Sequence, residues 1–260
     1  MINNHVIVCS PRMEYFRVSG LTKHNITSLS DPKKSLAQHL TLITLLIDSG
    51  YEVVDIHELD NHPNSVFTRD TSLVTSKGYV RLRMGLESRR GEEDWMANHL
   101  ETLGIKRAGS ISDNGTVEGG DVILTGSIAF VGLSKRTNEE GVNQLSAILN
   151  AMKIEVRTIE VPQLFLHLGG AMSILSPDGV LCCQGIFSVK FFDGFNKIEV
   201  PRDNFVTGNV ISIGYHDVIV EKSNISTINV LKQKGYHVHS LDLSEFIKGT
   251  GGPSCLILPV

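Results

Sequence analysis

Residues 120–134 read GDVILTGSIAFVGLS, and this stretch decides the fold because its pattern recurs along the chain. An apolar run, a small turn and a second apolar run are typical of a β-hairpin. The same pattern occurs at residues 71–85 (TSLVTSKGYVRLRMG), 171–185 (AMSILSPDGVLCCQG) and 209–221 (NVISIGYHDVIVE). The first three hairpins recur about fifty residues apart, and internal repeats of that period indicate a propeller or an array.

Helical segments and single strands alternate with these hairpins. Residues 31–50 predict a helix with Asp31 as the N-cap, Pro32 at the first helical position and Gly50 at the end. Further helices are predicted over residues 88–104, 137–153 and 223–235, and strands over residues 51–56, 105–110, 154–159 and 236–241. The predicted repeating unit is therefore a hairpin, a helix and a strand, and it occurs four times.

The two terminal segments complete the predicted architecture. HVIVCSP (residues 5–11) and CLILPV (residues 255–260) can pair as a fifth unit, which would leave no open sheet edge. We therefore predict an α/β fold in which five blades form a closed propeller, as one domain over residues 1–260. A doubly wound parallel sheet is the competing interpretation, and it is less favoured because hairpins outnumber plain βα units.

Composition excludes several classes of protein. The chain is 41% hydrophobic and 20% charged, which is ordinary for a globular protein, and its net charge of −4 is not that of a protein that binds nucleic acid or an anionic membrane. The longest apolar run, LTLITLLI, is too short to span a bilayer, and the N-terminal residues lack the features of a signal peptide. Four cysteines in a chain of this length do not form a disulfide framework, so a reduced, cytoplasmic protein is expected. The oligomeric state stays open, with a homo-oligomer as one possibility.

Four polar residues occupy equivalent positions in the repeats. Asp70, Glu118 and His167 precede the first strands of three hairpins, and Cys255 precedes the last apolar run. Equivalent positions of a closed propeller point towards its axis, so these side chains are expected to meet there. A thiol, an imidazole and two carboxylates are the side chains of a nucleophilic cysteine enzyme. Taken singly, each residue also suits a structural role, and the other cysteines, Cys9, Cys182 and Cys183, are expected in the core.

Two histidine motifs have spacings close to those of metal sites. In HELDNH, His57 and His62 are five residues apart, whereas the HExxH zinc motif requires a spacing of four. In HVHS, His237 and His239 share one strand face, but the sequence indicates no third ligand. We interpret both motifs as surface histidines and predict no metal and no cofactor.

The candidate residues lie in motifs that resemble those of the guanidino-group-modifying enzymes, the pentein superfamily. The resemblance covers nearly the whole chain, is closest to the dimethylarginine dimethylaminohydrolase family, and rests on NSVFTRDTSLV (64–74), ESRRGEE (87–93), EGGDVILTG (118–126), FVGLSKRTNEEG (130–141), LHLGG (166–170) and GGPSCLILPV (251–260). It implies a five-bladed pentein fold. It also implies hydrolysis of a small guanidino substrate through a covalent thiouronium intermediate.

The resemblance assigns a role to each candidate residue. Cys255 would be the nucleophile and His167 the general acid and base. Glu118 would bind the guanidinium and orient His167, while Asp70 would bind another guanidinium nitrogen. Arg89 and Arg136 match positions that grip the substrate α-carboxylate, which suits the bidentate geometry of arginine. Asn64 and Phe67 match further substrate-binding positions.

The motifs differ from the family pattern in ways that leave the substrate open. The family's Asp-Ser-x-Phe-x-Glu-Asp is replaced here by residues 64–70, NSVFTRD. FTRD and GGPSC resemble arginine deiminase instead, but the deiminase His-x-Asp motif is absent because Gly169 stands in the Asp position. Conversion of a methylated arginine to citrulline and a methylamine is the favoured hypothesis. Deimination or dihydrolysis of free arginine is one alternative, and a non-catalytic ribosome-binding pentein protein is an alternative of another class.

Overall fold

The strands form five three-stranded sheets in the computed structural model, which describes residues 5–260. Met1–Asn4 lie outside the described residues. They belong to the N-terminal segment that lacks the features of a signal peptide. In spatial order the sheets are β15 (Leu258–Pro259), β1 (His5–Cys9) and β2 (Glu52–Ile56); β3 (Ser72–Thr75), β4 (Gly78–Arg81) and β5 (Arg107–Ser110); β6 (Val122–Thr125), β7 (Ile128–Leu133) and β8 (Glu155–Glu160); β9 (Met172–Ser176), β10 (Gly179–Cys183) and β11 (Asn196–Val200); β12 (Val210–Gly214), β13 (Asp217–Glu221) and β14 (His237–Leu241).

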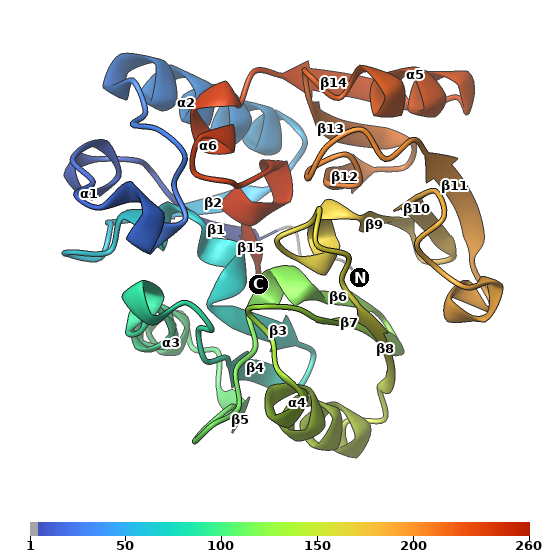
Figure 1. Cartoon of the computed structure of the whole chain (residues 1–260), viewed down its shortest axis with the longest axis horizontal. Coiled ribbons are helices and arrows are strands. Elements are labelled where there is room, and N and C mark those ends of the chain that lie inside the picture. The colour runs from blue at the N-terminus through green and yellow to red at the C-terminus, as the bar shows by residue number, and fades with distance from the viewer. Residues whose placement is uncertain (1–4) are drawn as a thin grey trace.

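Every sheet has the same internal topology. Its middle strand pairs antiparallel with one neighbour and parallel with the other. A parallel pair needs a crossover connection, which four sheets provide with a helix. These helices are α2 (Pro32–Asp48), α3 (Glu92–Thr102), α4 (Glu139–Ala151) and α5 (Ile225–Gln233). Figure 1 shows the sheets around a common centre, with the four helices at the periphery. The predicted α/β propeller of five blades is confirmed.

The fourth sheet corrects the prediction that each of the four hairpins is followed by a helix. Between β10 and β11 the chain makes only a 3₁₀ turn, η7 (Val189–Phe192). Gly185 and Gly194 have positive φ angles of 72° and 89°, which break a helical path on both sides of this turn. The aromatic residues of the connection pack instead on Phe130 of β7, with ring centroids between 5.1 and 5.5 Å for Phe191, Phe192 and Phe195.

The terminal strands close the ring as predicted. Val6 pairs with Pro259 and Ile7 with Leu258 in an antiparallel ladder, and the Val260 N–H donates to the His5 carbonyl oxygen at 2.9 Å. β1 is central in its sheet and its apolar residues from Val6 to Cys9 are fully buried, which anchors the closing strand in the core. At the N-terminus of α2, the Asp31 side chain accepts a hydrogen bond from the Lys34 N–H, as a helix cap should.

Short turns direct the chain towards the centre of the ring. Four 3₁₀ turns each lead into the first strand of a blade: η3 (Thr68–Asp70), η5 (Gly119–Asp121), η6 (Leu168–Gly170) and η8 (Pro253–Leu256). The remaining short elements are α1 (Met13–Phe16), α6 (Ser244–Ile247), η1 (Leu21–His24), η2 (Pro63–Val66) and η4 (Glu87–Arg89). Among residues 5–260, none of the helices combines the length and apolar character needed to cross a membrane.

Candidate active site

The four residues in equivalent repeat positions lie on or beside the four central turns. Asp70 ends η3, Glu118 and His167 directly precede η5 and η6, and Cys255 is the third residue of η8. His167 Nε2 lies 2.8 Å from Glu118 Oε2, and His167 Nδ1 lies 3.9 Å from Asp70 Oδ1. Cys255 lines the same pockets as His167. The structure therefore brings all four side chains to one place near the ring axis.

Hydrogen bonds between neighbouring turns hold this arrangement. The Gly120 N–H of η5 donates to Asp70 Oδ1 of η3 at 3.0 Å, and the Leu168 N–H of η6 donates to Asp121 Oδ1 of η5 at 2.9 Å. Gly120 also permits a close approach, because a Cβ atom there would lie 2.6 Å from His167 Nδ1. The turns thus position one another across the ring.

Glu118 is a fully buried carboxylate whose charge is compensated on several sides. Its Oε1 accepts hydrogen bonds from the Gly85 and Leu86 N–H groups, both at 3.0 Å, and Arg136 Nη1 lies 3.1 Å from Oε2. Burial alone would raise the pKa of Glu118, but the hydrogen bond from His167 and the nearby arginines hold it well below its usual value. Glu118 is therefore ionised at neutral pH.

His167 is buried among carboxylates and carries a proton as a result. Burial lowers its pKa, but the charges of Asp70 and Asp121 and the hydrogen bond to Glu118 outweigh burial and raise the pKa to about 9. An imidazolium at neutral pH is prepared to donate a proton rather than to accept one.

Cys255 is the only half-buried thiol among the four cysteines, all of which are described and free. Cys9, Cys182 and Cys183 are buried in strands, as predicted. Burial, together with the charge of Asp70, raises the pKa of Cys255 to about 12, although the Gly252 N–H, 3.4 Å from Sγ, acts in the opposite direction. The resting residue is therefore a thiol.

Asn209 is a site residue that the sequence analysis did not single out. It directly precedes β12, so it occupies in the remaining blade the position that the other four residues occupy in theirs. Its Oδ1 accepts from the Ser254 N–H at 2.9 Å, and its Nδ2 donates to the Gly169 carbonyl oxygen at 3.0 Å and lies 4.0 Å from Cys255 Sγ. It thereby connects the turn of Cys255 to that of His167. The register of the NVISIG hairpin with the other repeats was the signal that could have found it.

The residues assigned to substrate binding line a small pocket, defined as the hollow bounded by Asn64, Phe67, Asp70, Arg89, Arg136, Leu166, His167, Gly249, Thr250, Gly251 and Cys255. Its free volume is about 10 Å³. Phe67 packs so tightly on Gly251 that a Cβ atom there would lie 2.2 Å from the ring. The buried Asn64 Oδ1 has no hydrogen-bond partner, so it offers an acceptor for an N–H donor.

Arg89 is buried and engaged by the protein itself. Its Nη1 donates to Asp70 Oδ2 at 2.5 Å, its Nε to Glu92 Oε2 at 2.9 Å, and its Nη2 to the Phe67 carbonyl oxygen at 3.0 Å. Burial lowers the pKa of Arg89, but these carboxylates outweigh it and raise the pKa. A guanidinium is thus already bound to Asp70. The expected grip of Arg89 on a substrate carboxylate stays a prediction and requires these bonds to exchange.

A larger cavity of about 580 Å³ meets the site from the side of strands β6, β9 and β12. Its lining includes His167, Cys255, Asn209 and Arg69. Arg69, which stands where the family pattern has Glu, donates through Nη2 to the Val122 carbonyl oxygen at 3.0 Å. His167 and Cys255 therefore line both the small pocket and this cavity.

The oxygens of Asp70 and Glu118 and a ring nitrogen of His167 lie within 4.8 Å of one another, as metal ligands can. Here Arg89 and Arg136 compensate the two carboxylates, at 2.5 Å from Asp70 and 3.1 Å from Glu118. The cationic partners of both carboxylates are thus supplied by the protein itself.

Comparison with known proteins yields relatives along the whole chain. The arginine deiminase family profile matches residues 47–199. An N(G),N(G)-dimethylarginine dimethylaminohydrolase from Pseudomonas aeruginosa is 31% identical, with 98% of each chain covered, and one from Streptomyces coelicolor is 29% identical, with 95% of this chain and 92% of the relative covered. The solved structure of a Cys-to-Ser mutant of the P. aeruginosa protein complexed with citrulline superposes with a TM-score of 0.87 at 29% identity and covers 100% of both chains.

Proposed function

The chain belongs to the family of guanidino-group-modifying enzymes that includes dimethylarginine dimethylaminohydrolase and arginine deiminase, and on this premise we propose that it hydrolyses the guanidino group of a methylated arginine. The products are citrulline and a methylamine. The observation that carries the proposal is that Asp70, His167 and Cys255 line one pocket and that Glu118 is hydrogen-bonded to His167, since these are the side chains the reaction needs. A non-catalytic ribosome-binding role would require no such group.

We assign binding of the substrate cation to Asp70, which lines the small pocket, and to Glu118, which is hydrogen-bonded to His167 of that pocket. A guanidinium carbon is a poor electrophile because resonance spreads its charge, so planar positioning against the nucleophile is a large part of the catalysis. Asp70 and Glu118 accept hydrogen bonds from its nitrogens, and Asn64 Oδ1 adds an acceptor that has no partner among residues 5–260. Entry of the substrate requires Arg89 to release Asp70 Oδ2, to which it is bound at 2.5 Å.

The bound cation also activates the nucleophile. The thiol of Cys255 has a pKa of about 12 in the free protein, so little thiolate is present at neutral pH. A positive charge next to Sγ favours the thiolate and lowers this pKa. The positive charge of the substrate therefore favours the thiolate that attacks it.

The protonated His167 then serves as the general acid. The Cys255 thiol releases its proton to solvent as the bound cation favours the thiolate. Attack of this thiolate on the guanidinium carbon forms a tetrahedral adduct, and His167 donates its proton to the departing amine as the C–N bond breaks. The thiouronium that remains is attacked by water, whose proton returns to the neutral His167. Collapse of this second adduct breaks the C–S bond, the remaining hydroxyl proton passes to sulfur as the citrulline carbonyl forms, and both the thiol and the imidazolium are thereby restored.

The choice of a methylated substrate follows the 31% identical relative from P. aeruginosa. Gly169 stands in the position of the deiminase Asp, and it would favour a methylated substrate if the missing side chain left room beside one guanidinium nitrogen. A Cβ atom at residue 169 would lie 3.1 Å from the Gly120 carbonyl oxygen, and Gly169 lines the larger cavity rather than the small pocket. Space at Gly169 is therefore not an argument for the methyl groups.

Free arginine is a second candidate substrate, favoured by Asn64. A dimethylated nitrogen has no N–H group, whereas each terminal nitrogen of arginine can donate to an acceptor such as the unpartnered Asn64 Oδ1. Leaving a buried acceptor unpaired costs about 1–3 kcal/mol, which bears on the choice between the two substrates.

Two further parts of the proposal come from the sequence. The first is that residues 1–260 form one catalytic domain. The second is that the protein is cytoplasmic, and this is supported by the four cysteines, all of which are free thiols in the structure.

Product analysis with asymmetric dimethylarginine, monomethylarginine and arginine side by side tests the proposal. We expect citrulline from the wild type, with kcat/KM highest for a methylated substrate, and none from the Cys255→Ser variant, which should retain the fold. A higher kcat/KM for arginine with release of ammonia would overturn the substrate but not the mechanism. Undiminished turnover by the serine variant would overturn the mechanism.

A further inference from the structure

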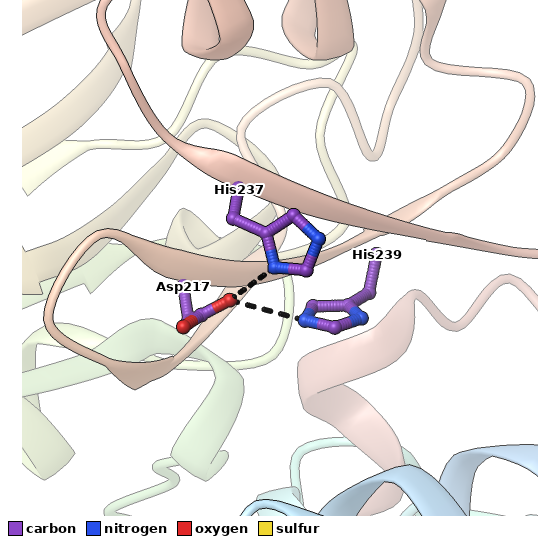
Figure 2. A group of neighbouring side chains, drawn as sticks. All are labelled: Asp217, His237 and His239. Carbon is purple, nitrogen blue, oxygen red and sulfur yellow. Dashed lines mark hydrogen bonds and ion pairs between the residues drawn. The ribbon is translucent and has the colours of Figure 1, made fainter.

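A second cluster of polar side chains lies on the fifth sheet, between strands β13 and β14. Asp217 begins β13 and stands in parallel register with His237, which begins β14. His239 follows two residues later and therefore projects from the same face of the sheet. Figure 2 shows the three side chains converging. The sequence indicated the two histidines without a third ligand, and the pairing of β13 with β14 supplies it.

The two imidazoles converge on one carboxylate oxygen. His237 Nδ1 lies 2.6 Å and His239 Nε2 lies 3.1 Å from Asp217 Oδ1, and the ring centroids are 4.3 Å apart. The three side chains are 73%, 26% and 41% exposed, in the order His237, His239 and Asp217. An ion can therefore reach all three ligand atoms directly from solvent.

We propose that Asp217, His237 and His239 form a surface site for a divalent transition-metal ion of the zinc class. Two imidazole nitrogens and a carboxylate oxygen are a typical three-residue ligand set for zinc, with further positions left to water. Bonds of about 2.0–2.2 Å in tetrahedral geometry place ligand atoms about 3.3 Å apart. The two imidazole nitrogens lie 2.6 and 3.1 Å from Asp217 Oδ1, so each must move away from this oxygen by less than about 1 Å to bind the ion. Rotation of these exposed side chains provides that movement.

The surrounding structure holds the ligands in place. The His237 N–H donates to the His216 carbonyl oxygen at 2.7 Å, and the ladder between β13 and β14 continues from Asp217 to Glu221. β14 is the outer strand of its sheet, so an ion at this site joins an edge strand to its neighbour. His239 also lines a surface groove between α2 and β14, which leaves room for solvent ligands.

The chain offers a matched control on the first blade. His5 Nε2 lies 3.2 Å from Glu52 Oε2 across the parallel pair of β1 and β2, and both side chains are exposed. Among the described residues this pair is not part of a group of three metal-ligating side chains. It therefore shares the register and chemistry of the proposed site but lacks the third ligand.

Calorimetric titration of the metal-free protein with ZnCl₂, paired with melting curves with and without Zn²⁺, tests the proposal. We expect zinc binding and a zinc-dependent rise in Tm in the wild type, an affinity loss of about tenfold or more in D217N, H237A and H239A, and none in H5A. The zinc-dependent part of the Tm distinguishes metal binding from the loss of a hydrogen bond. No binding by the wild type, equal binding by the three site variants, or an equal loss in H5A would overturn the proposal.

Discussion

The substitution Glu118→Gln tests whether the Glu118 carboxylate keeps His167 protonated. Glutamine preserves the shape of the side chain, but it removes the charge that lies 2.8 Å from His167 Nε2. A hydrogen bond to a charged partner contributes about 1.5–3 kcal/mol and a neutral one about 0.5–1.5 kcal/mol. These values differ by about 1–1.5 kcal/mol, and one pKa unit corresponds to about 1.4 kcal/mol, so the pKa of His167 should fall by about one unit from its value of about 9. The charges of Asp70 and Asp121 prevent a larger fall.

The pH dependence of kcat measures this change. With a pKa of about 8 in the variant, about three-quarters of the wild type and about one-quarter of the variant are protonated at pH 8.5, whereas at pH 6 nearly all of both are. The ratio of wild-type to variant kcat should therefore rise about threefold between these pH values. Loss of the guanidinium partner adds a factor that does not depend on pH. A ratio that does not change with pH would refute the reasoning. Glu221→Gln, which neutralises a buried carboxylate on β13, is the control and should leave the alkaline limb in place.

Three further outcomes follow from the site. Cationic chloroacetamidine should alkylate Cys255 at neutral pH at least about tenfold faster than neutral chloroacetamide, because a bound cation lowers the thiol pKa from about 12; peptide mass spectrometry showing equal rates would contradict this. The folded-state pKa of His167 is raised from 6.5 to about 9, so its stabilising contribution is complete below pH 6.5 and is lost as the pH rises to 9. The free energy of unfolding from denaturant titrations should fall by about 3 kcal/mol over that window in the wild type and by clearly less in His167→Asn. Gly120→Ala should reduce kcat/KM by about a hundredfold or more, because its Cβ would lie 2.6 Å from His167 Nδ1. Gly126→Ala, where the added Cβ would have no neighbour within 4 Å, should retain activity.

Hairpin repeats could be predicted from the sequence because they depend on local patterns, and pairing of the terminal segments could be predicted because it completes a fifth unit of the repeat. Alternating apolar runs and turn residues identify a hairpin without knowledge of its neighbours. The connection after β10 departs from the pattern because its phenylalanines pack on Phe130 of another blade, and a tertiary contact of this kind leaves no periodic signal.

Only those site residues that stand at an equivalent position of the repeats could be predicted from the sequence. Asp70, Glu118, His167 and Cys255 were found because each stands at the same point of a repeat, and Asn209 could have been found in the same way. The pairing of Arg89 with Asp70 was not predictable, since it depends on how two side chains pack across a turn. Asp217 was missed as a partner of His237 because the register of two parallel strands separated by a helix is set only in the folded protein.

The hydrogen bonds between the central turns determine how local unfolding of one blade affects catalysis. Each turn is held by its neighbour, as Asp70 is by Gly120 and Ser254 by Asn209, and the turns come from segments dispersed along the chain. Local unfolding of one blade therefore displaces the pocket residues of its own turn. It also removes the hydrogen bonds that hold the turn of the neighbouring blade. The catalytic rate should therefore depend on the folding of every blade. A destabilising substitution should reduce it even where the substituted residue lies far from Cys255.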